Sequence, residues 1–393
     1  MTMIDRGSPR ESADDSPLAA LGITARVRGV HRLSDGALAA RMVALTGPPG
    51  SSLEAEDDLR HVAALMQQTA DLDDYAIRFT RRLAAAADLP LLTVVDPSSA
   101  ANLAVPVTGL SVSLEPRDLA RSPRRCLDTV RVARAAGRRV CVRVGVDDLA
   151  LAVLPIIEPD VVVLRSEVIA QVRDPSVARL VQEVTAHLEN SAAVVLAEGV
   201  DSLDAARTAL SLGAQYGTGA AFDDPASVAV VAPFPAPVAA CARHEPTGTP
   251  FAILAATHRP RRGDESLLQE MGRSLEAQAT GTGAAALVVR TAGASCELGH
   301  LTARRWDGIA DTTGMTTTYG VRMPLLRTTH DAQHPTGPGW NIAVVGPHVA
   351  ALLAARPLPS ADGDRRFEFV QTYDRATVVA ATRALLREFA EAN

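Results

Sequence analysis

The chain has 393 residues and a formal net charge of −6, with 47% hydrophobic but only 3% aromatic residues. This length predicts two domains, and the negative charge argues against a general attraction to nucleic acid or to an anionic membrane. The sequence contains no lysine, so all 39 residues counted as Lys or Arg are arginine.

The N-terminal residues and the cysteines indicate the cellular compartment of the protein. No run of about 18 apolar residues is present, and the N-terminus lacks the charged segment and apolar core of a signal peptide. The four cysteines have no CxxC spacing, which is typical of reduced thiols rather than of a disulfide framework or a zinc site. We therefore expect a cytoplasmic protein without a membrane segment, preceded by a disordered tail over residues 1–20.

Strand-like and helical segments alternate through the first half of the chain. The predicted strands are 23–33, 38–45, 91–95, 109–114, 139–146, 161–164 and 194–197. The predicted helices lie within 54–87, 123–136 and 175–189. This alternation is typical of a parallel barrel or a doubly wound sheet.

One β/α unit, residues 194–222, carries an acidic residue at the end of an apolar strand. Glu198 follows this strand directly and is followed by Gly199. Asp201 is predicted to cap the next helix, and Gly213 to end it. In β/α barrels the carboxyl ends of the strands meet at one mouth, where the chemistry takes place.

This stretch resembles the closing part of an EAL domain, the barrel phosphodiesterase of cyclic di-GMP. The matching residues are Ala197-Glu198-Gly199-Val200-Asp201, Leu212-Gly213, Gly219, Phe222 and Pro225. The resemblance selects a TIM-type β/α barrel over residues 21–233. It also implies a site for two divalent cations and a water that attacks the phosphodiester.

Five acidic residues are expected around this mouth as a residual metal or ligand site: Asp96, Glu115, Asp147, Asp148 and Glu198. Compared with the family pattern, Met42 replaces the signature carboxylate and Thr46 replaces a phosphate-binding arginine. The lysine that helps to activate the water is absent from the whole chain. We therefore expect a catalytically degenerate domain without a cofactor; Mg²⁺ or Mn²⁺ would bind only if the acidic site is functional.

The missing lysine also has an electrostatic consequence at Glu198. With Asp147 and Asp148 expected nearby and no cation among them, the carboxylates should repel one another. Such repulsion raises at least one pKa and lowers stability at neutral pH.

The second half of the chain begins after a proline-rich segment, 234–250, which we interpret as a linker between separately folded halves. The predicted strands are 251–255, 284–289, 340–345 and 366–371. The predicted helices are one capped by Asp264, one over 349–355 and one over 374–391. These elements make a smaller α/β domain, residues 251–393.

Two segments of this half, 339–354 and 365–386, resemble a DICT domain, a sensory module found beside cyclic-di-GMP turnover domains. The resemblance implies a sensory role and a candidate pocket lined by Trp340, Asn341, His348, Phe367 and Thr372. Trp340 and Phe367 are also typical core anchors, and Asp374 a helix cap.

Taken together, the two resemblances predict a bacterial signalling protein that acts by binding a partner protein or a small-molecule ligand. Cyclic di-GMP remains a candidate ligand, weakened by the loss at Thr46, and a homodimer is possible; nucleic acid is not expected. The alternative is a metal-dependent phosphodiesterase that hydrolyses cyclic di-GMP to the linear product with Asp147, Asp148 and Glu198.

Overall fold

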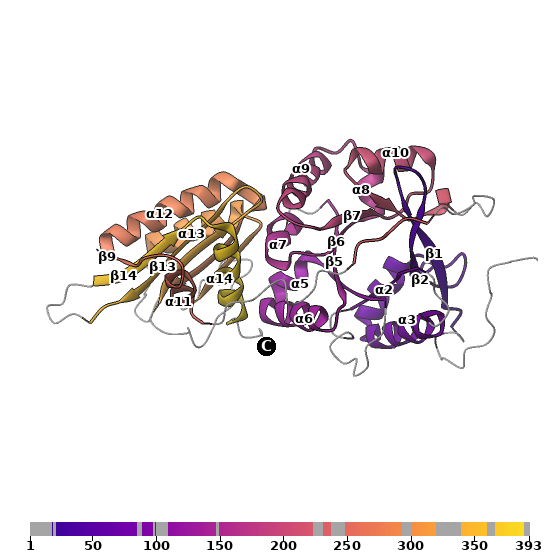
Figure 1. Cartoon of the computed structure of the whole chain (residues 1–393), viewed down its shortest axis with the longest axis horizontal. Helices are drawn as coiled ribbons and strands as arrows, with labels where there is room; N and C mark the ends of the chain where they lie inside the picture. Colours follow the sequence, from indigo (N-terminus) through magenta and orange to yellow (C-terminus); the bar gives the residue numbers. More distant parts are fainter. Residues whose placement is uncertain are drawn as a thin grey trace, which may run out of the picture.

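The computed structural model describes residues 18, 21–84, 89–96, 99, 109–146, 149–222, 231–236, 248–292, 300–319, 339–359 and 366–388. These residues form a closed barrel followed by a six-stranded sheet (Figure 1). Apart from residue 18, the predicted tail lies outside the described residues, as does the greater part of the predicted linker.

The first domain is a closed barrel of eight strands in the order β1 to β8. The strands are β1 (Thr24–Arg32), β2 (Leu38–Thr46), β3 (Leu91–Val95), β4 (Leu110–Leu114), β5 (Arg139–Val144), β6 (Val161–Leu164), β7 (Val194–Ala197) and β8 (Tyr216–Gly217). Strand β1 runs antiparallel to β2 and β8, whereas the other neighbouring pairs are parallel. The predicted β/α barrel is confirmed.

Helices surround the barrel strands (Figure 1). They are α2 (Glu56–Leu65), α3 (Thr69–Ala84), α5 (Pro116–Arg121), α6 (Pro123–Ala135), α7 (Leu149–Ile157), α8 (Ser166–Ala170), α9 (Pro175–Glu189), α10 (Leu203–Ser211) and the 3₁₀ turn η1 (Ala220–Phe222). The helices predicted over 54–87, 123–136 and 175–189 therefore correspond to α2 with α3, α6 and α9.

The end of the barrel at which the parallel strands begin is covered by residues 231–236. Phe234 is buried there against Tyr216, and the Pro235 carbonyl accepts a hydrogen bond of 2.9 Å from Arg139 Nη2. The first residues of the predicted linker are thus packed against the barrel. The opposite end, where the strands finish, carries the polar side chains described below.

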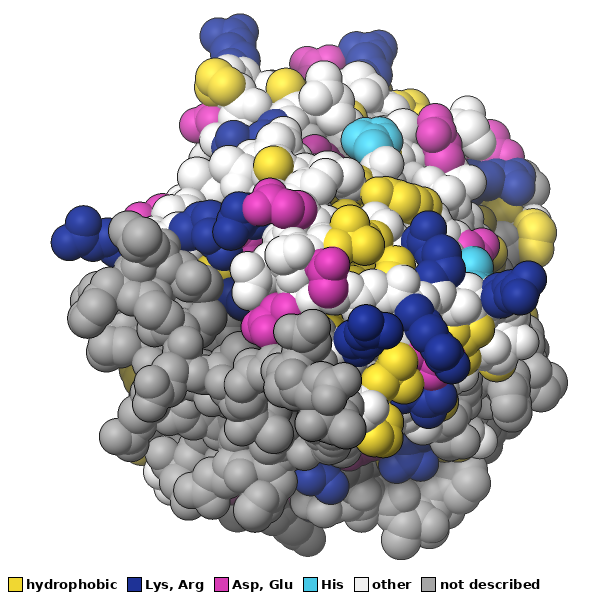
Figure 2. Space-filling view, turned by 90° about the vertical axis from the view of Figure 1, so that its left-hand side faces the viewer, with side chains coloured by type: hydrophobic (Ala, Val, Ile, Leu, Met, Phe, Trp, Pro, Cys, Tyr) yellow, Lys and Arg dark blue, Asp and Glu magenta, His cyan; other side chains and the backbone are white. Residues whose placement is uncertain are grey.

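The second domain is a sheet in the order β11-β10-β12-β13-β14-β9. Its strands are β9 (Arg261–Asp264), β10 (Leu287–Ala292), β11 (Met315–Tyr319), β12 (Trp340–Val345), β13 (Ala350–Pro357) and β14 (Arg366–Thr372). Its helices are α11 (Pro250–Ala255), α12 (Glu265–Thr282), α13 (His300–Thr312) and α14 (Arg375–Arg387), with the 3₁₀ turn η3 (Gly283–Ala285). Figure 2 shows the end of this domain remote from the barrel, where arginine and acidic side chains are interspersed on the described surface.

The two faces of this sheet are covered by different helices. One face packs on α12 and α13 through a cluster that includes Leu275 and Trp306. The other packs on α14 and α11, of which α14 lies between the sheet and the barrel helices (Figure 1). The domain therefore turns its α14 face toward the barrel.

Two predictions for the second domain are wrong. Residues 251–255 belong to helix α11 instead of a strand, because Thr249 caps that helix and Pro250 occupies its first turn. Residues 350–355 lie in strand β13 instead of a helix, although Ala and Leu favour helices. Strand β13 pairs with β12 and β14 and is buried on both faces, so tertiary pairing overrides the local preference.

The predicted caps had mixed outcomes. Asp264 and Asp374 cap α12 and α14, with side chains that accept from Leu267 N and Thr377 N. Asp201 does not cap α10; Ser202 does, and the Asp201 carboxylate accepts instead from Ala220 N. None of the described helices is long and apolar enough to cross a membrane.

Candidate functional site

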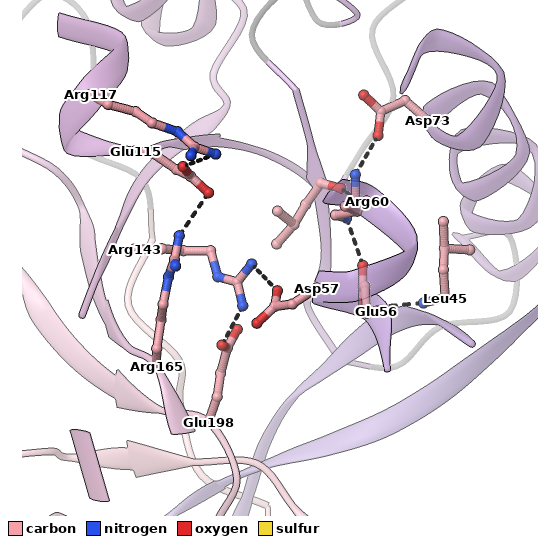
Figure 3. A network of polar contacts seen from close by, with 11 residues as sticks. Leu45, Glu56, Asp57, Arg60, Asp73, Glu115, Arg117, Arg143, Arg165 and Glu198 are labelled. Atoms are coloured by element: carbon pink, nitrogen blue, oxygen red, sulfur yellow. Dashed lines mark hydrogen bonds and ion pairs between the residues drawn. The ribbon is translucent and has the colours of Figure 1, made fainter. Parts of the chain in front are cut away.

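A cleft of about 250 Å³ opens at the mouth of the barrel, between helix α2 and the carboxyl ends of β3 to β6. Its charged lining consists of the arginines Arg60, Arg117, Arg143 and Arg165 and the acidic residues Asp57, Asp96, Glu115 and Asp118. Opposite charges therefore lie near one another around the cleft, and ion pairs join several of them directly (Figure 3).

Arg143 forms the first of these groups. It lies near the end of β5, two residues after Cys141 of the barrel interior, so the alternation of the strand turns its side chain inward. Its Nη1 donates to Asp57 of α2 at 2.7 Å, and its Nη2 donates to Glu198 at 2.6 Å. One guanidinium thus joins helix α2 to the end of β7 (Figure 3).

The electrostatics of this group are set by burial. Burial raises the pKa of the Glu198 carboxyl, and the nearby Arg143 guanidinium offsets this only in part. Burial also opposes the charge of Arg143, but the carboxylates of Glu198 and Asp57 together outweigh it and raise the pKa of the guanidinium. Arg143 is therefore a fixed positive charge inside the mouth.

Glu115 forms the second group. It precedes α5 in a capping box, in which its backbone N–H donates to the Asp118 carboxylate at 2.7 Å. Its own carboxylate accepts from Arg165 at 2.7 Å through one oxygen and pairs with Arg117 at 2.5 Å through the other. Both oxygens of Glu115 are therefore occupied by guanidinium groups.

Arg60 forms the third group and fixes α2 over the mouth. It pairs with Glu56 and Asp73 at 2.9 Å each and donates to the Val94 carbonyl at 2.9 Å. Asp73 in turn accepts from the backbone N–H of Asp96 at 2.8 Å. Helix α2 is thereby attached to α3 and to the end of β3.

The structure brings together part of the predicted acidic ring. Asp96 and Glu115 line the cleft, and Glu198 adjoins it through Arg143. Asp147 and Asp148 lie outside the described residues. Met42 and Thr46 of β2 are both buried.

The described side chains do not fit a metal centre. Within the described part of the chain, no three His, Cys, Asp or Glu side chains are grouped so that they could hold a metal ion. A cation bound by Glu198 or Glu115 would compete with guanidinium groups at 2.6 and 2.7 Å from their oxygens. These carboxylates therefore belong to ion pairs.

The expectation that Glu198 is unscreened is wrong, because Arg143 lies 2.6 Å from its carboxylate. The expected neighbours Asp147 and Asp148 lie outside the described residues. Sequence reasoning missed both Arg143 and Arg165. The alternation of side chains along a strand could have found them. Arg143 comes two residues after Cys141, and Arg165 two residues after Val163, and both of these earlier residues face the barrel interior. An arginine at such a position needs a hydrogen-bond acceptor, and here the carboxylates of Glu198 and Glu115 supply it.

The predicted sensory residues are distributed over both faces of the second sheet. Trp340 and Phe367 are half-buried on the α12 face. Asn341 points to the other face and donates to Thr291 Oγ1 at 2.7 Å. Thr372 lies 2.9 Å from the His258 ring nitrogen, and His348 is exposed in the turn between β12 and β13. The five side chains therefore do not meet at one point.

Comparison with known proteins gives structural matches alone, since no family model and no curated protein matches the sequence. The EAL domain of Xanthomonas citri FimX, solved with c-diGMP, has 16% identity and a TM-score of 0.42 over 52% of this chain and 88% of its own. An EAL domain protein from Listeria monocytogenes has 14% identity and a TM-score of 0.42, covering 53% of this chain and 90% of its own.

A longer protein, Vibrio cholerae LapD with an S helix, GGDEF and EAL segments, has 14% identity and a TM-score of 0.44. This match covers 51% of the present chain and 53% of the LapD chain. These three structures are thus EAL domains or contain one, and each match spans about half of the present chain.

Proposed function

We propose that this chain is a signalling protein whose EAL-like barrel binds a ligand or a partner protein and does not hydrolyse cyclic di-GMP. The observation that carries the proposal is the ion pair between Arg143 and Glu198 at the barrel mouth. Hydrolysis by two cations needs carboxylate oxygens that are free to ligate them and a water between them. The guanidinium of Arg143 occupies one oxygen of Glu198, Oε2, at 2.6 Å.

The second ion-pair group supports the same proposal. Glu115 is held by Arg165 on one oxygen and by Arg117 on the other, so it has no oxygen left without a cationic neighbour. Displacing a guanidinium from a partly buried carboxylate leaves a charge unpaired, which costs several kcal/mol, on the order of 3–5. A divalent cation would have to overcome this cost at both positions.

The second domain is proposed to be the sensory part, on the strength of its resemblance to DICT domains. The barrel would then pass the sensed state to a partner, with cyclic di-GMP as one candidate ligand of the mouth. The rival function is metal-dependent hydrolysis of cyclic di-GMP, for which Asp147, Asp148 and Glu198 would supply oxygens.

The experiment is incubation of the full chain with cyclic di-GMP and either Mg²⁺ or Mn²⁺, with chromatographic assay of the linear product. We expect no product above the buffer blank, for the chain itself and for a control variant, Arg207→Gln, whose ion pair on α10 is exposed. Metal-dependent product that disappears in Glu198→Gln would overturn the proposal. Equilibrium dialysis of labelled cyclic di-GMP then decides whether it is the ligand.

A further inference from the structure

Helix α7 has an unusual composition for the outer helix of a barrel. Its sequence, LALAVLPII over Leu149–Ile157, contains no polar side chain. An outer helix normally presents one apolar face to the strands and one polar face to water, whereas a helix that is apolar all round is buried. Helix α7 therefore needs a second cover on the side that faces away from the barrel.

The second domain supplies this cover. Residues 152–154, 156 and 157 of α7 are each at most 1% exposed. Within the barrel, α7 packs on α5 and α9; on its other side it packs on η3 and α14 (Figure 1). The contact is close: a Cβ added to Gly314 would come within 3.1 Å of the Ala152 methyl group. One apolar cluster consequently runs from the barrel into the second sheet.

The carboxyl end of α7 is also completed from the second domain. The last carbonyls of a helix have no partner within it, and a cation there is favourable. Arg383 of α14 donates through Nε to the Ile156 carbonyl at 2.7 Å, and its Nη2 lies 2.8 Å from the Glu158 carboxylate. Arg134 of α6 donates to the next two carbonyls, those of Ile157 and Glu158.

We propose that the outer face of α7 is a permanent interaction surface whose partner is the second domain of the same chain. The two domains then unfold as one cooperative unit. This inference contrasts with the expectation of two separately folding halves, and it is independent of the proposed function.

The test uses the position of the tryptophans. The chain has two, and both Trp306 and Trp340 lie in the second domain, so tryptophan fluorescence follows that domain alone. Leu72 of α3 is 1% exposed in a separate apolar cluster of the barrel, so Leu72→Ala destabilises the barrel without touching the interface. Leu72→Val is the milder version if the alanine variant does not fold.

Urea unfolding of the full chain is followed by tryptophan fluorescence and by far-ultraviolet circular dichroism. We expect the Leu72 variant to shift both midpoints to lower urea by the same amount. A fluorescence midpoint that stays at the wild-type value, while the dichroism signal moves or divides into two steps, would overturn the inference.

A second measurement examines the interface itself by amide hydrogen exchange. In Arg383→Gln, peptides covering 149–158 should exchange faster by about tenfold or more, because the end of α7 loses its cation and a carbonyl loses its donor. Arg273→Gln, which removes an exposed arginine of α12, is the matched control. Equal exchange over 149–158 in the two variants would contradict the role of Arg383.

Discussion

At the scale of single residues, Arg143 determines the character of the barrel mouth. Its two Nη atoms hold Asp57 and Glu198, so one side chain neutralises the mouth and joins helix α2 to strand β7. The arginine does so from a position that is 13% exposed, where water can replace little of the lost interaction. Its removal and the removal of Glu198 should therefore have opposite effects.

Replacing Arg143 by methionine should destabilise the chain strongly. The variant leaves Glu198, whose side chain is 19% exposed, without its cation, and breaking a largely buried pair costs about 3–5 kcal/mol of unfolding free energy. Urea titration at pH 7 measures the loss. Arg207→Met removes a pair that is mostly exposed and should cost less than about 0.5 kcal/mol. Equal losses in the two variants would mean that the Arg143 pair is not a buried one in solution.

Replacing Glu198 by glutamine should be neutral or stabilising at pH 7, by up to ~1 kcal/mol. The reason is burial, which raises the pKa of Glu198, so that ionisation of this carboxyl costs stability. Because the pKa of Glu198 is higher in the folded state than in the unfolded state, wild-type stability falls as the pH rises above the ordinary pKa of a glutamate. The advantage of the glutamine variant should therefore vanish at low pH, where Glu198 is protonated in both states. Urea midpoints at pH 4 and pH 7 check this, and a glutamine variant that is less stable than wild type at pH 7 would refute it.

At the scale of helices and strands, the sequence predicts most elements but not their partners. Glu198 is predictable because an apolar strand ends beside it, and the helix over 175–189 because its period and its proline are clear. The pairing of Glu198 with Arg143 is not predictable from the sequence. The two residues lie on β5 and at the end of β7, which β6 separates, so their side chains approach only in the folded barrel. The prediction of a helix over residues 350–355 failed for a related reason. These residues form a strand because the two neighbouring strands pair with them.

Helix α14 offers a prediction at this scale. Asp374 caps it by accepting from the Thr377 hydroxyl and backbone N–H, and these hydrogen bonds lower the pKa of Asp374. Asp374→Ala should cost about 1 kcal/mol of unfolding free energy at pH 7. Because the folded-state pKa is lowered, this contribution is present above the ordinary value and is lost as the pH falls below it. Thermal melting of wild type and Asp374→Ala at pH 7 and pH 3 measures the loss of stability at each pH. Asp374→Asn keeps a side-chain acceptor and should retain most of the stability. A loss that is the same at both pH values would contradict the charge contribution.

At the scale of the whole molecule, the chain combines a mouth neutralised by its own arginines with a second domain seated on the barrel. Ion pairs occupy the carboxylates Glu115 and Glu198, and α7 connects the strand of Arg143 to the surface covered by α14. These ion pairs leave Glu115 and Glu198 little capacity for cations.

The most direct test of whether Glu198 belongs to an ion pair or ligates a metal is thermal melting. The wild-type chain and Glu198→Gln are each melted with and without millimolar Mg²⁺ or Mn²⁺. A cation that binds the folded state raises the melting temperature by mass action. Because guanidinium groups already occupy Glu115 and Glu198, we expect the same melting temperature with and without the cation in both proteins. A cation-dependent rise in the wild type that disappears in Glu198→Gln would contradict the account, because it would show that Glu198 is a metal ligand.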